Sequence, residues 1–158
     1  MTASPNEYES VQNPLFEDDG LFGEEAPAQP SQAIVQTSYQ LMDFSNISPM
    51  DTQAALVHFD GDEKFMMEMC AVFIESLPER FAEIQTALNK NNANMLGRLA
   101  HNLKGTCLNF GTEPLAALSA ELEAMGKRED LQFAPFVVEQ MQKEIRRLQE
   151  FVSNQQLV

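Results

Sequence analysis

From residue 48 onward, apolar residues recur three and four positions apart almost without interruption, and this spacing strongly limits what the chain can fold into. Such spacing places side chains on one face of an α-helix, whereas a half-buried strand requires alternation with a period of two. No stretch of this region alternates in that way. The pattern therefore predicts an all-α protein in which each helix buries one face.

Breaks in the pattern divide the region into a short leading helix and four long helices. The short helix is expected to begin with Ser48 as N-cap and Pro49 as first helical residue, and to end near Phe59. The long helices are predicted over about 62–89, 93–110, 112–126 and 131–152. Because short loops join successive helices, we expect an antiparallel four-helix bundle.

Particular residues are expected to begin, bend or end these helices. Asp62 and Thr112 are candidate N-caps, and Pro78 predicts a kink or break in the first long helix. The stretch Gly126–Arg128 is predicted to stop the third, because its two cations suit a helix C-terminus.

The first 45 residues have a different composition. They contain four prolines and eight acids but no lysine or arginine, so they bury too little apolar surface to offset the entropy of ordering. We therefore divide the chain into a disordered, acidic N-terminal tail or linker (1–45) and a bundle domain (46–158). Within the tail, Leu15–Glu25 combines leucine and phenylalanine with acids, which indicates either a short docking motif or a plain linker.

Charge and hydropathy exclude several classes of function. The chain has 158 residues and a formal net charge of −14, which argues against binding to nucleic acid or to anionic membrane surfaces. The N-terminus lacks the pattern of a secretory signal, and no apolar run approaches the roughly 18 residues that span a bilayer. We expect a cytoplasmic monomer whose partners are proteins.

Metal and cofactor chemistry is also disfavoured. Cys70 and Cys107 lie 37 residues apart on apolar helix faces, so they are interpreted as small buried hydrophobic residues. His58 is interpreted as a solvated residue. With two histidines and no cluster of ligand residues, we expect no metal site and no cofactor.

His101 is the strongest candidate for a functional residue. On a helical wheel, the apolar residues of its helix fall on the opposite side, which predicts that the imidazole is exposed. Gly97 and Gly105 lie four residues before and after it. Each glycine costs roughly 1 kcal/mol relative to alanine in a helix interior, which suggests that another molecule approaches the backbone there. Tight packing against a neighbouring helix is the alternative.

The residue types around His101 suit the transfer of an anionic group. An uncharged imidazole is a nucleophile near neutral pH. Lys104, one turn further on, would place an ammonium beside phosphoryl oxygens, and Arg98 is a second candidate cation. Leu108 lies on the same face as a candidate apolar docking contact. A surface histidine without a function remains the alternative on these residues alone.

The segment from Ala100 to Gly111, AHNLKGTCLNFG, resembles the signature of histidine phosphotransfer (HPt) domains from two-component phosphorelays. The resemblance covers about residues 46–152, including the helices before and after this segment. It implies that His101 accepts a phosphoryl group, that Lys104 assists the transfer, and that Gly105 keeps the surface open to a docking receiver domain. Thr106 and Cys107 occupy positions where serine or alanine is more usual.

The resemblance implies a phosphorelay intermediate, which takes a phosphoryl group from the aspartate of one receiver domain and passes it to another. The receivers, in response regulators or hybrid sensor kinases, would supply the Mg²⁺. Because the sequence lacks a glycine-rich phosphate loop, we expect a phosphocarrier without autokinase activity. Two rivals are a bundle that only binds receivers and a metal- or haem-binding four-helix protein.

Overall fold

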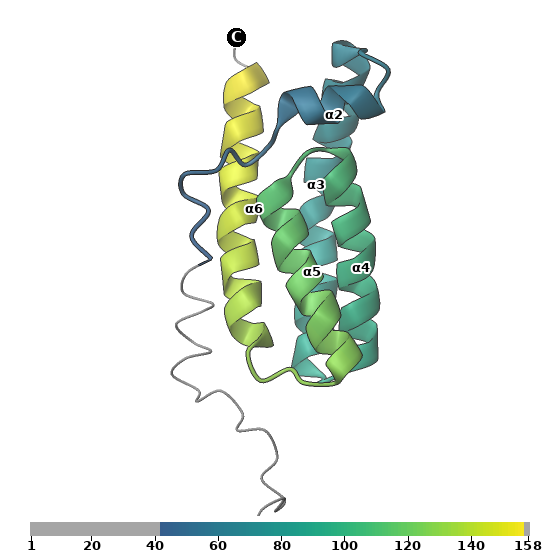
Figure 1. The fold of residues 1–158 in the computed structure, drawn as a ribbon, viewed down its shortest axis with the longest axis vertical. Coiled ribbons are helices and arrows are strands. Elements are labelled where there is room, and N and C mark those ends of the chain that lie inside the picture. Colours follow the sequence, from purple (N-terminus) through teal and green to yellow (C-terminus); the bar gives the residue numbers. More distant parts are fainter. Residues whose placement is uncertain (1–41, 157–158) are drawn as a thin grey trace, which may run out of the picture. The chain divides into compact units, whose positions relative to one another are not determined.

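The computed structural model describes residues 42–156, and the regular structure of this part is entirely helical (Figure 1). Its helices are α2 (Thr52–His58), α3 (Glu63–Asn89), α4 (Ala93–Asn109), α5 (Glu113–Arg128) and α6 (Ala134–Gln156). The all-α prediction is therefore confirmed. Residues 1–41, which include the predicted Leu15–Glu25 motif, lie outside the described residues.

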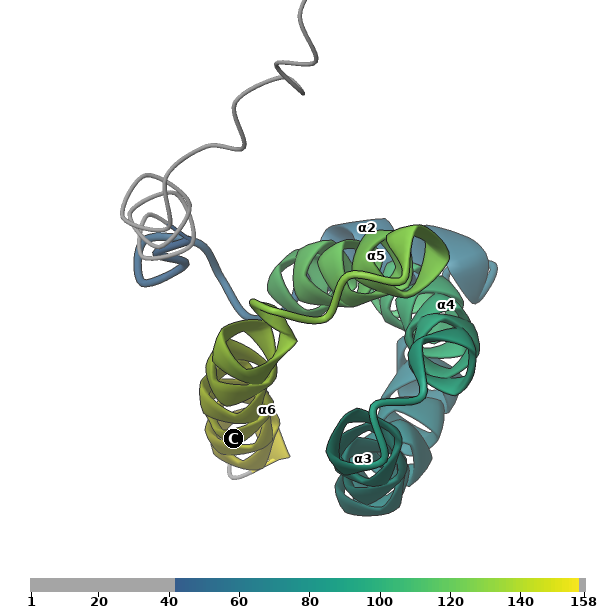
Figure 2. The ribbon, with the colours of Figure 1, turned by 90° about the horizontal axis from the view of Figure 1, so that it is seen from below.

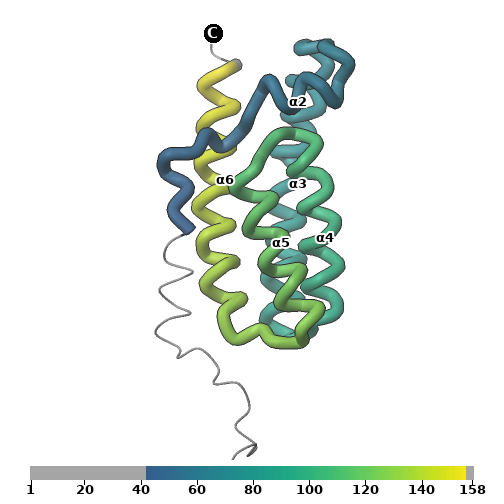
Figure 3. The backbone as a smooth tube through the Cα atoms, in the orientation of Figure 1, coloured from purple at the N-terminus to yellow at the C-terminus, as the bar shows by residue number. Residues whose placement is uncertain are grey.

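The four long helices form the predicted antiparallel bundle. Seen end-on, α3, α4, α5 and α6 follow one another around a common core (Figure 2). Helix α6 also contacts α3. The tube in Figure 3 shows the chain running up and down through these helices, with α2 at one end of the bundle. None of the helices in the described range 42–156 is long and apolar enough to cross a membrane.

The short helix begins later than the sequence predicts. Asp51, not Ser48, is its N-cap, and the Asp51 carboxylate accepts a hydrogen bond from the Ala54 amide (3.0 Å). The Asp51 amide donates to the carbonyl of Gly111 in the turn between α4 and α5 (2.8 Å). This long-range hydrogen bond holds Asp51 at the turn between α4 and α5, and the helix begins only at Thr52. Pro49 therefore lies outside the helix.

The long helices begin and end close to the predicted positions, and the predicted break at Pro78 is absent. The α3 helix continues through Pro78 without a break, with Leu77 and Phe81 buried beside the proline. Asp62 and Thr112 are the N-cap residues of α3 and α5, as predicted. The Thr112 hydroxyl donates to the Cys107 carbonyl, however, and makes no cap hydrogen bond to α5. The α5 helix ends at Arg128, within the predicted stop Gly126–Arg128, and Glu129 follows in a left-handed conformation.

The core runs the length of the bundle and is built from aliphatic, methionine and phenylalanine side chains. Cys70 and Cys107 are buried within it, as predicted, and burial raises the pKa of each thiol to about 11. Met95 is 37% exposed although it is apolar, because α4 turns Gly97 and Ala100 toward its neighbours instead.

The contact between Gly97 and Gly126 explains this rotation and corrects the expectation for Gly97. Gly97 is buried, and a Cβ atom added to Gly126 would lie 2.6 Å from the Gly97 Cα atom. Helices α4 and α5 therefore approach each other through their backbones at this point. The missing side chain of Gly126 permits this approach, since a Cβ atom added to Gly97 itself would lie at an ordinary contact distance of 3.4 Å from the Gly126 Cα atom. Gly97 is packed against α5, as in the alternative considered above, and does not face the open surface.

Residues 42–50 lie against the bundle. Arg147 of α6 donates hydrogen bonds to the carbonyls of Phe44 and Ile47, each at 2.9 Å, and pairs with the carboxylate of Glu144 at 2.7 Å. The side chains of Met42 and Phe44 pack against the core. Residues 42–45, which the sequence division assigned to the tail, thus contact the helical domain.

Candidate functional site

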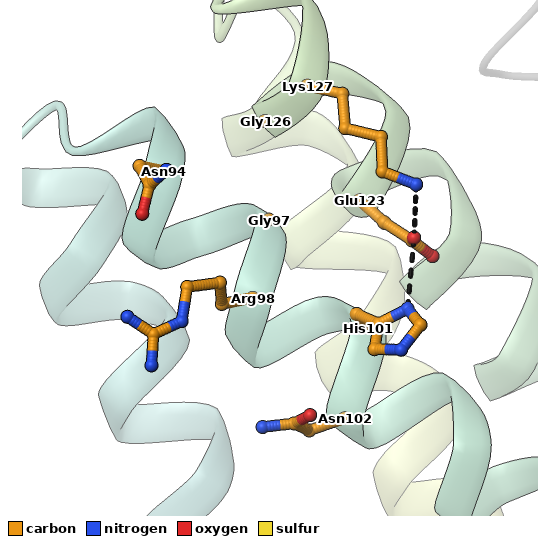
Figure 4. Close-up of a pocket in the computed structure, with 8 residues that line it drawn as sticks. All are labelled: Asn94, Gly97, Arg98, His101, Asn102, Glu123, Gly126 and Lys127. Atoms are coloured by element: carbon orange, nitrogen blue, oxygen red, sulfur yellow. Dashed lines mark hydrogen bonds and ion pairs between the residues drawn. The ribbon is translucent and has the colours of Figure 1, made fainter.

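His101 lies on the outer face of α4, and its side chain is 64% exposed. Its neighbours Ala100 and Leu103 are buried and anchor this part of the helix. The predicted exposure of the imidazole is therefore confirmed. The ring stands at the edge of an open hollow of about 490 Å³ between α4 and α5 (Figure 4).

The imidazole is hydrogen-bonded to a carboxylate from the neighbouring helix. Nδ1 of His101 lies 3.0 Å from Oε1 of Glu123 on α5. The same carboxylate accepts hydrogen bonds from Lys104 at Oε2 and from Lys127 at Oε1, the latter at 2.6 Å. One carboxylate thus joins one imidazole and two ammonium groups. We call these four residues the His101 cluster.

Glu123 is ionised in this setting. Its side chain is only 6% exposed, and burial by itself would favour the neutral acid. The hydrogen bonds from Lys104 and Lys127 outweigh that effect, with a smaller contribution from His101, and lower the pKa of Glu123 from 4.5 to about 2. Near neutral pH the carboxylate is therefore only an acceptor of hydrogen bonds.

The Glu123 carboxylate determines which nitrogen of a neutral His101 ring carries the proton. Since an ionised carboxylate cannot donate, the hydrogen bond requires the proton on Nδ1. Nε2 then carries the lone pair. Among the described residues no hydrogen bond to Nε2 is found. The exposed ring thus offers an unprotonated nitrogen that another molecule can reach.

The other predicted site residues occupy different surroundings. Lys104 reaches the cluster, but the guanidinium of Arg98 extends away from His101 and Glu123 (Figure 4). Gly105 is exposed, and a Cβ atom added there would have no neighbour within 4 Å. Leu108 is 54% exposed. Gly105 and Leu108 therefore lie on an open surface beside the histidine, whereas Gly97 lies beneath the hollow, against α5.

Glu123 and Lys127 were not predicted from the sequence as site residues. Glu123 interrupts a mostly buried face of α5, between Leu122 and Met125, and Lys127 follows it by one helical turn. The sequence did contain a signal for this pair, because a carboxylate at a core-facing position is followed four residues later by a cation. Lys127 had been interpreted only as a cation at a helix terminus.

The described residues contain no group of three or more His, Cys, Asp or Glu side chains that could hold a metal ion.

A four-helix bundle that presents an exposed, hydrogen-bonded histidine on one helix has the features of a histidine phosphotransfer module. The family model described as "Hpt domain" matches residues 68–151. The chain belongs to the Hpt domain family. It is accordingly a phosphotransfer protein of two-component signalling.

Two solved structures resemble the chain. Histidine-containing phosphotransfer protein B (HptB) from Pseudomonas aeruginosa PAO1 is 27% identical, with a TM-score of 0.64 over 69% of this chain and 95% of that protein. The HPT domain of a sensor hybrid histidine kinase from Shewanella is 22% identical, with a TM-score of 0.60 over 68% and 92%, and shares the fold. A comparison with curated protein sequences found no match.

Proposed function

We propose that the chain is a phosphorelay intermediate in which His101 accepts a phosphoryl group from the aspartyl phosphate of one receiver domain and passes it to the aspartate of another. The observation that carries this proposal is the hydrogen bond between Nδ1 of His101 and the ionised carboxylate of Glu123. It directs the lone pair of the exposed ring to Nε2, the nitrogen that an incoming phosphoryl group can reach.

In the first transfer, the Nε2 lone pair attacks the phosphorus atom. A nitrogen–phosphorus bond forms as the bond between phosphorus and the aspartate oxygen breaks, and that electron pair stays on the aspartate carboxylate. The ring, still protonated at Nδ1, becomes positively charged, and the Glu123 carboxylate offsets this charge. The second transfer reverses these steps toward another aspartate.

The lysines favour the same transfer. Glu123, Lys104 and Lys127 together have a formal charge of +1 within a chain whose net charge is −14. This local positive charge attracts a phosphoryl group and offsets the charge on its oxygens during transfer. Gly105 and Leu108 form part of the surface on which the receiver docks. The protein acts as a carrier and has no autokinase activity.

A labelling experiment tests this function. The chain is incubated with a receiver domain that carries a radiolabelled aspartyl phosphate, and the label on the chain is followed over time. We expect an acid-labile, base-stable label on the wild type and on His58→Gln, and none on His101→Gln. Binding without transfer would favour the rival function of a bundle that only sequesters receivers. An equally labelled His101→Gln variant would refute His101 as the acceptor.

A further inference from the structure

Helix α3 carries a row of apolar side chains outside its buried face. Phe65, Met69 and Val72 follow one another at spacings of four and three residues, so they lie on one side of the helix. Phe65 and Val72 are 47% and 58% exposed, while Met69 between them packs partly against the core. The Phe65 ring stands edge-on to Phe59, with ring centroids 5.8 Å apart. The row is thus an ordered apolar surface that the bundle itself does not cover.

A row of carboxylates runs beside this apolar row. Glu68, Glu75 and Glu79 are exposed and lie about 70° around the helix axis from the apolar side chains. Within residues 42–156, none of the three forms an ion pair. The two rows therefore combine uncovered apolar surface with unpaired negative charge. We call them together the α3 face, which consists of Phe65, Glu68, Met69, Val72, Glu75 and Glu79.

The α3 face lies apart from the His101 cluster. Helices α3 and α5 are on opposite sides of α4 (Figure 2), and His101 is bonded to Glu123 on α5. Phe73, the neighbour of Val72, stacks on Phe110 with ring centroids 4.8 Å apart. Phe110 follows His101 by nine residues, which corresponds to about 13 Å along α4. No residue of the α3 face lines the hollow beside the imidazole.

The charge of the α3 face determines which class of molecule can cover it. Nucleic acids and anionic membranes carry charge of the same sign and would be repelled. A second copy of this chain would bring its own acidic row against the first, and like charges at a contact are unfavourable. A protein surface with apolar and basic side chains is complementary to both rows.

The shape of the α3 face favours a helix as the covering element. The rows run from Phe65 to Glu79, a length of about 21 Å, which equals about four turns of a helix. Straight rows of this length on one helix match the rows on the surface of a second helix, which packs along them. An apolar row on the second helix, bordered by cations, would meet both rows of the α3 face.

We propose that the α3 face binds a helix of a partner protein that carries an apolar row bordered by lysine or arginine side chains. The apolar row supplies most of the affinity, by burying Phe65 and Val72. The exposed glutamates contribute less to affinity and instead set the orientation and the rate of association. Such a partner leaves the imidazole of His101 free. The inference goes beyond the proposed function and does not require it.

A synthetic peptide tests the inference. The probe is a fluorescent helix of leucine, alanine and lysine, about 18 residues long, whose leucines recur three and four positions apart and are bordered by lysines. We expect saturable binding to the full chain, measured by fluorescence anisotropy. Val72→Asn, which leaves the net charge unchanged, should raise the Kd about tenfold. Glu75→Lys should raise it by a similar factor. Both positions are exposed, and circular dichroism checks that the variants remain folded.

Two variants are matched controls. Leu108→Asn removes an apolar side chain of similar exposure, 54%, from α4, and Glu150→Lys reverses the charge of an exposed glutamate on α6. Both should bind the peptide within about twofold of the wild type, and so should His101→Gln. The inference is overturned if the wild type does not bind the peptide, or if a scrambled peptide of the same composition binds as tightly. Equal weakening by Val72→Asn and Leu108→Asn, or lost binding in His101→Gln, would also overturn it.

Discussion

Nδ1 of His101 lies 3.0 Å from Oε1 of Glu123, although 22 residues separate them in the chain. The distance depends on a second relationship between the same two helices. Gly97 and Gly126, one turn from His101 and Glu123 respectively, bring the backbones of α4 and α5 together. The glycine contact thus sets the separation at which a carboxylate on α5 meets an imidazole on α4.

Alanine at Gly126 should separate these helices. Its Cβ atom would lie 2.7 Å from the Ala93 carbonyl oxygen and from the Gly97 amide nitrogen, both of which are backbone atoms. We expect the free energy of unfolding to fall by about 2–3 kcal/mol in urea denaturation. Gly105→Ala is the control, because the space around it is open, and it should gain about 0.5–1 kcal/mol from helix propensity. A stable Gly126→Ala variant would contradict the close approach.

Glu123→Ala removes the carboxylate that holds the proton of the neutral His101 ring on Nδ1, so the proton should be free to move to Nε2. In the wild type the Nδ1–H tautomer is expected to dominate, and ¹⁵N chemical shifts of the His101 ring measure the tautomer ratio directly. The tautomer ratio of the variant should shift toward the Nε2–H form. The variant should also accept a phosphoryl group from a receiver domain about tenfold more slowly than the wild type. Glu121→Ala, on the same helix, serves as the control. An unchanged tautomer ratio in Glu123→Ala would argue against this role.

The ionisation of Glu123 makes part of the stability depend on pH. Its pKa is lowered in the folded state from 4.5 to about 2, first by Lys104 and then by Lys127. A carboxyl group of this kind stabilises the fold above its unfolded pKa, and the contribution is lost as the pH falls through the folded one. The stability advantage of the wild type over Glu123→Gln should therefore shrink between about pH 4.5 and 2. Urea denaturation across this range measures it. Glu139→Gln is the control, because Glu139 forms a surface ion pair with Lys143. The difference in stability between the wild type and this variant should stay small over the whole pH range.

The two lysines of the cluster should not be equivalent. Both contact Glu123, but the side chain of Lys104 is 30% exposed and that of Lys127 is 73% exposed. Water screens the more exposed pair, so Lys127→Met should cost no more than about 0.5 kcal/mol and Lys104→Met about 1–2 kcal/mol. Lys104→Met should also slow phosphoryl transfer more strongly. Thermal denaturation and the labelling assay test the order, and a larger effect of Lys127→Met on both would reverse it.

A bulky side chain at Gly105 should obstruct docking without disturbing the fold. Gly105 is exposed and has open space above it, so Gly105→Leu should unfold at the same urea concentration as the wild type or a higher one. Transfer from a receiver should slow by about tenfold, because the leucine holds the partner away from Nε2. Labelling by phosphoramidate, a small donor that needs no docking surface, should not change. Receiver transfer at the wild-type rate would remove the argument for close approach at this residue.

The sequence alone determined the properties that depend on neighbouring residues along the chain. Apolar residues three and four positions apart predicted the helices and their order. Asp62 was correctly predicted as the N-cap of α3. The apolar residues on the opposite face of its helix predicted that His101 is exposed. These properties follow from helix periodicity and from hydrogen bonds within a few residues. The same local reasoning placed the start of the short helix too early, because a bond from Asp51 to the distant Gly111 decides it.

The tertiary structure decided the partners of His101. Whether Glu123 reaches the imidazole depends on the distance and rotation between α4 and α5, which the contact of Gly97 with Gly126 fixes. A helical wheel describes one helix and contains neither the distance nor the rotation between two helices. Gly97 was therefore assigned to the open surface beside His101. Likewise, only the folded chain brings Phe44 and Ile47 beside Leu108, because Arg147 binds their carbonyls from about a hundred residues away. Exposure of the histidine is a local property, whereas its hydrogen bond to Glu123 comes from the packing of segments that are distant in the chain.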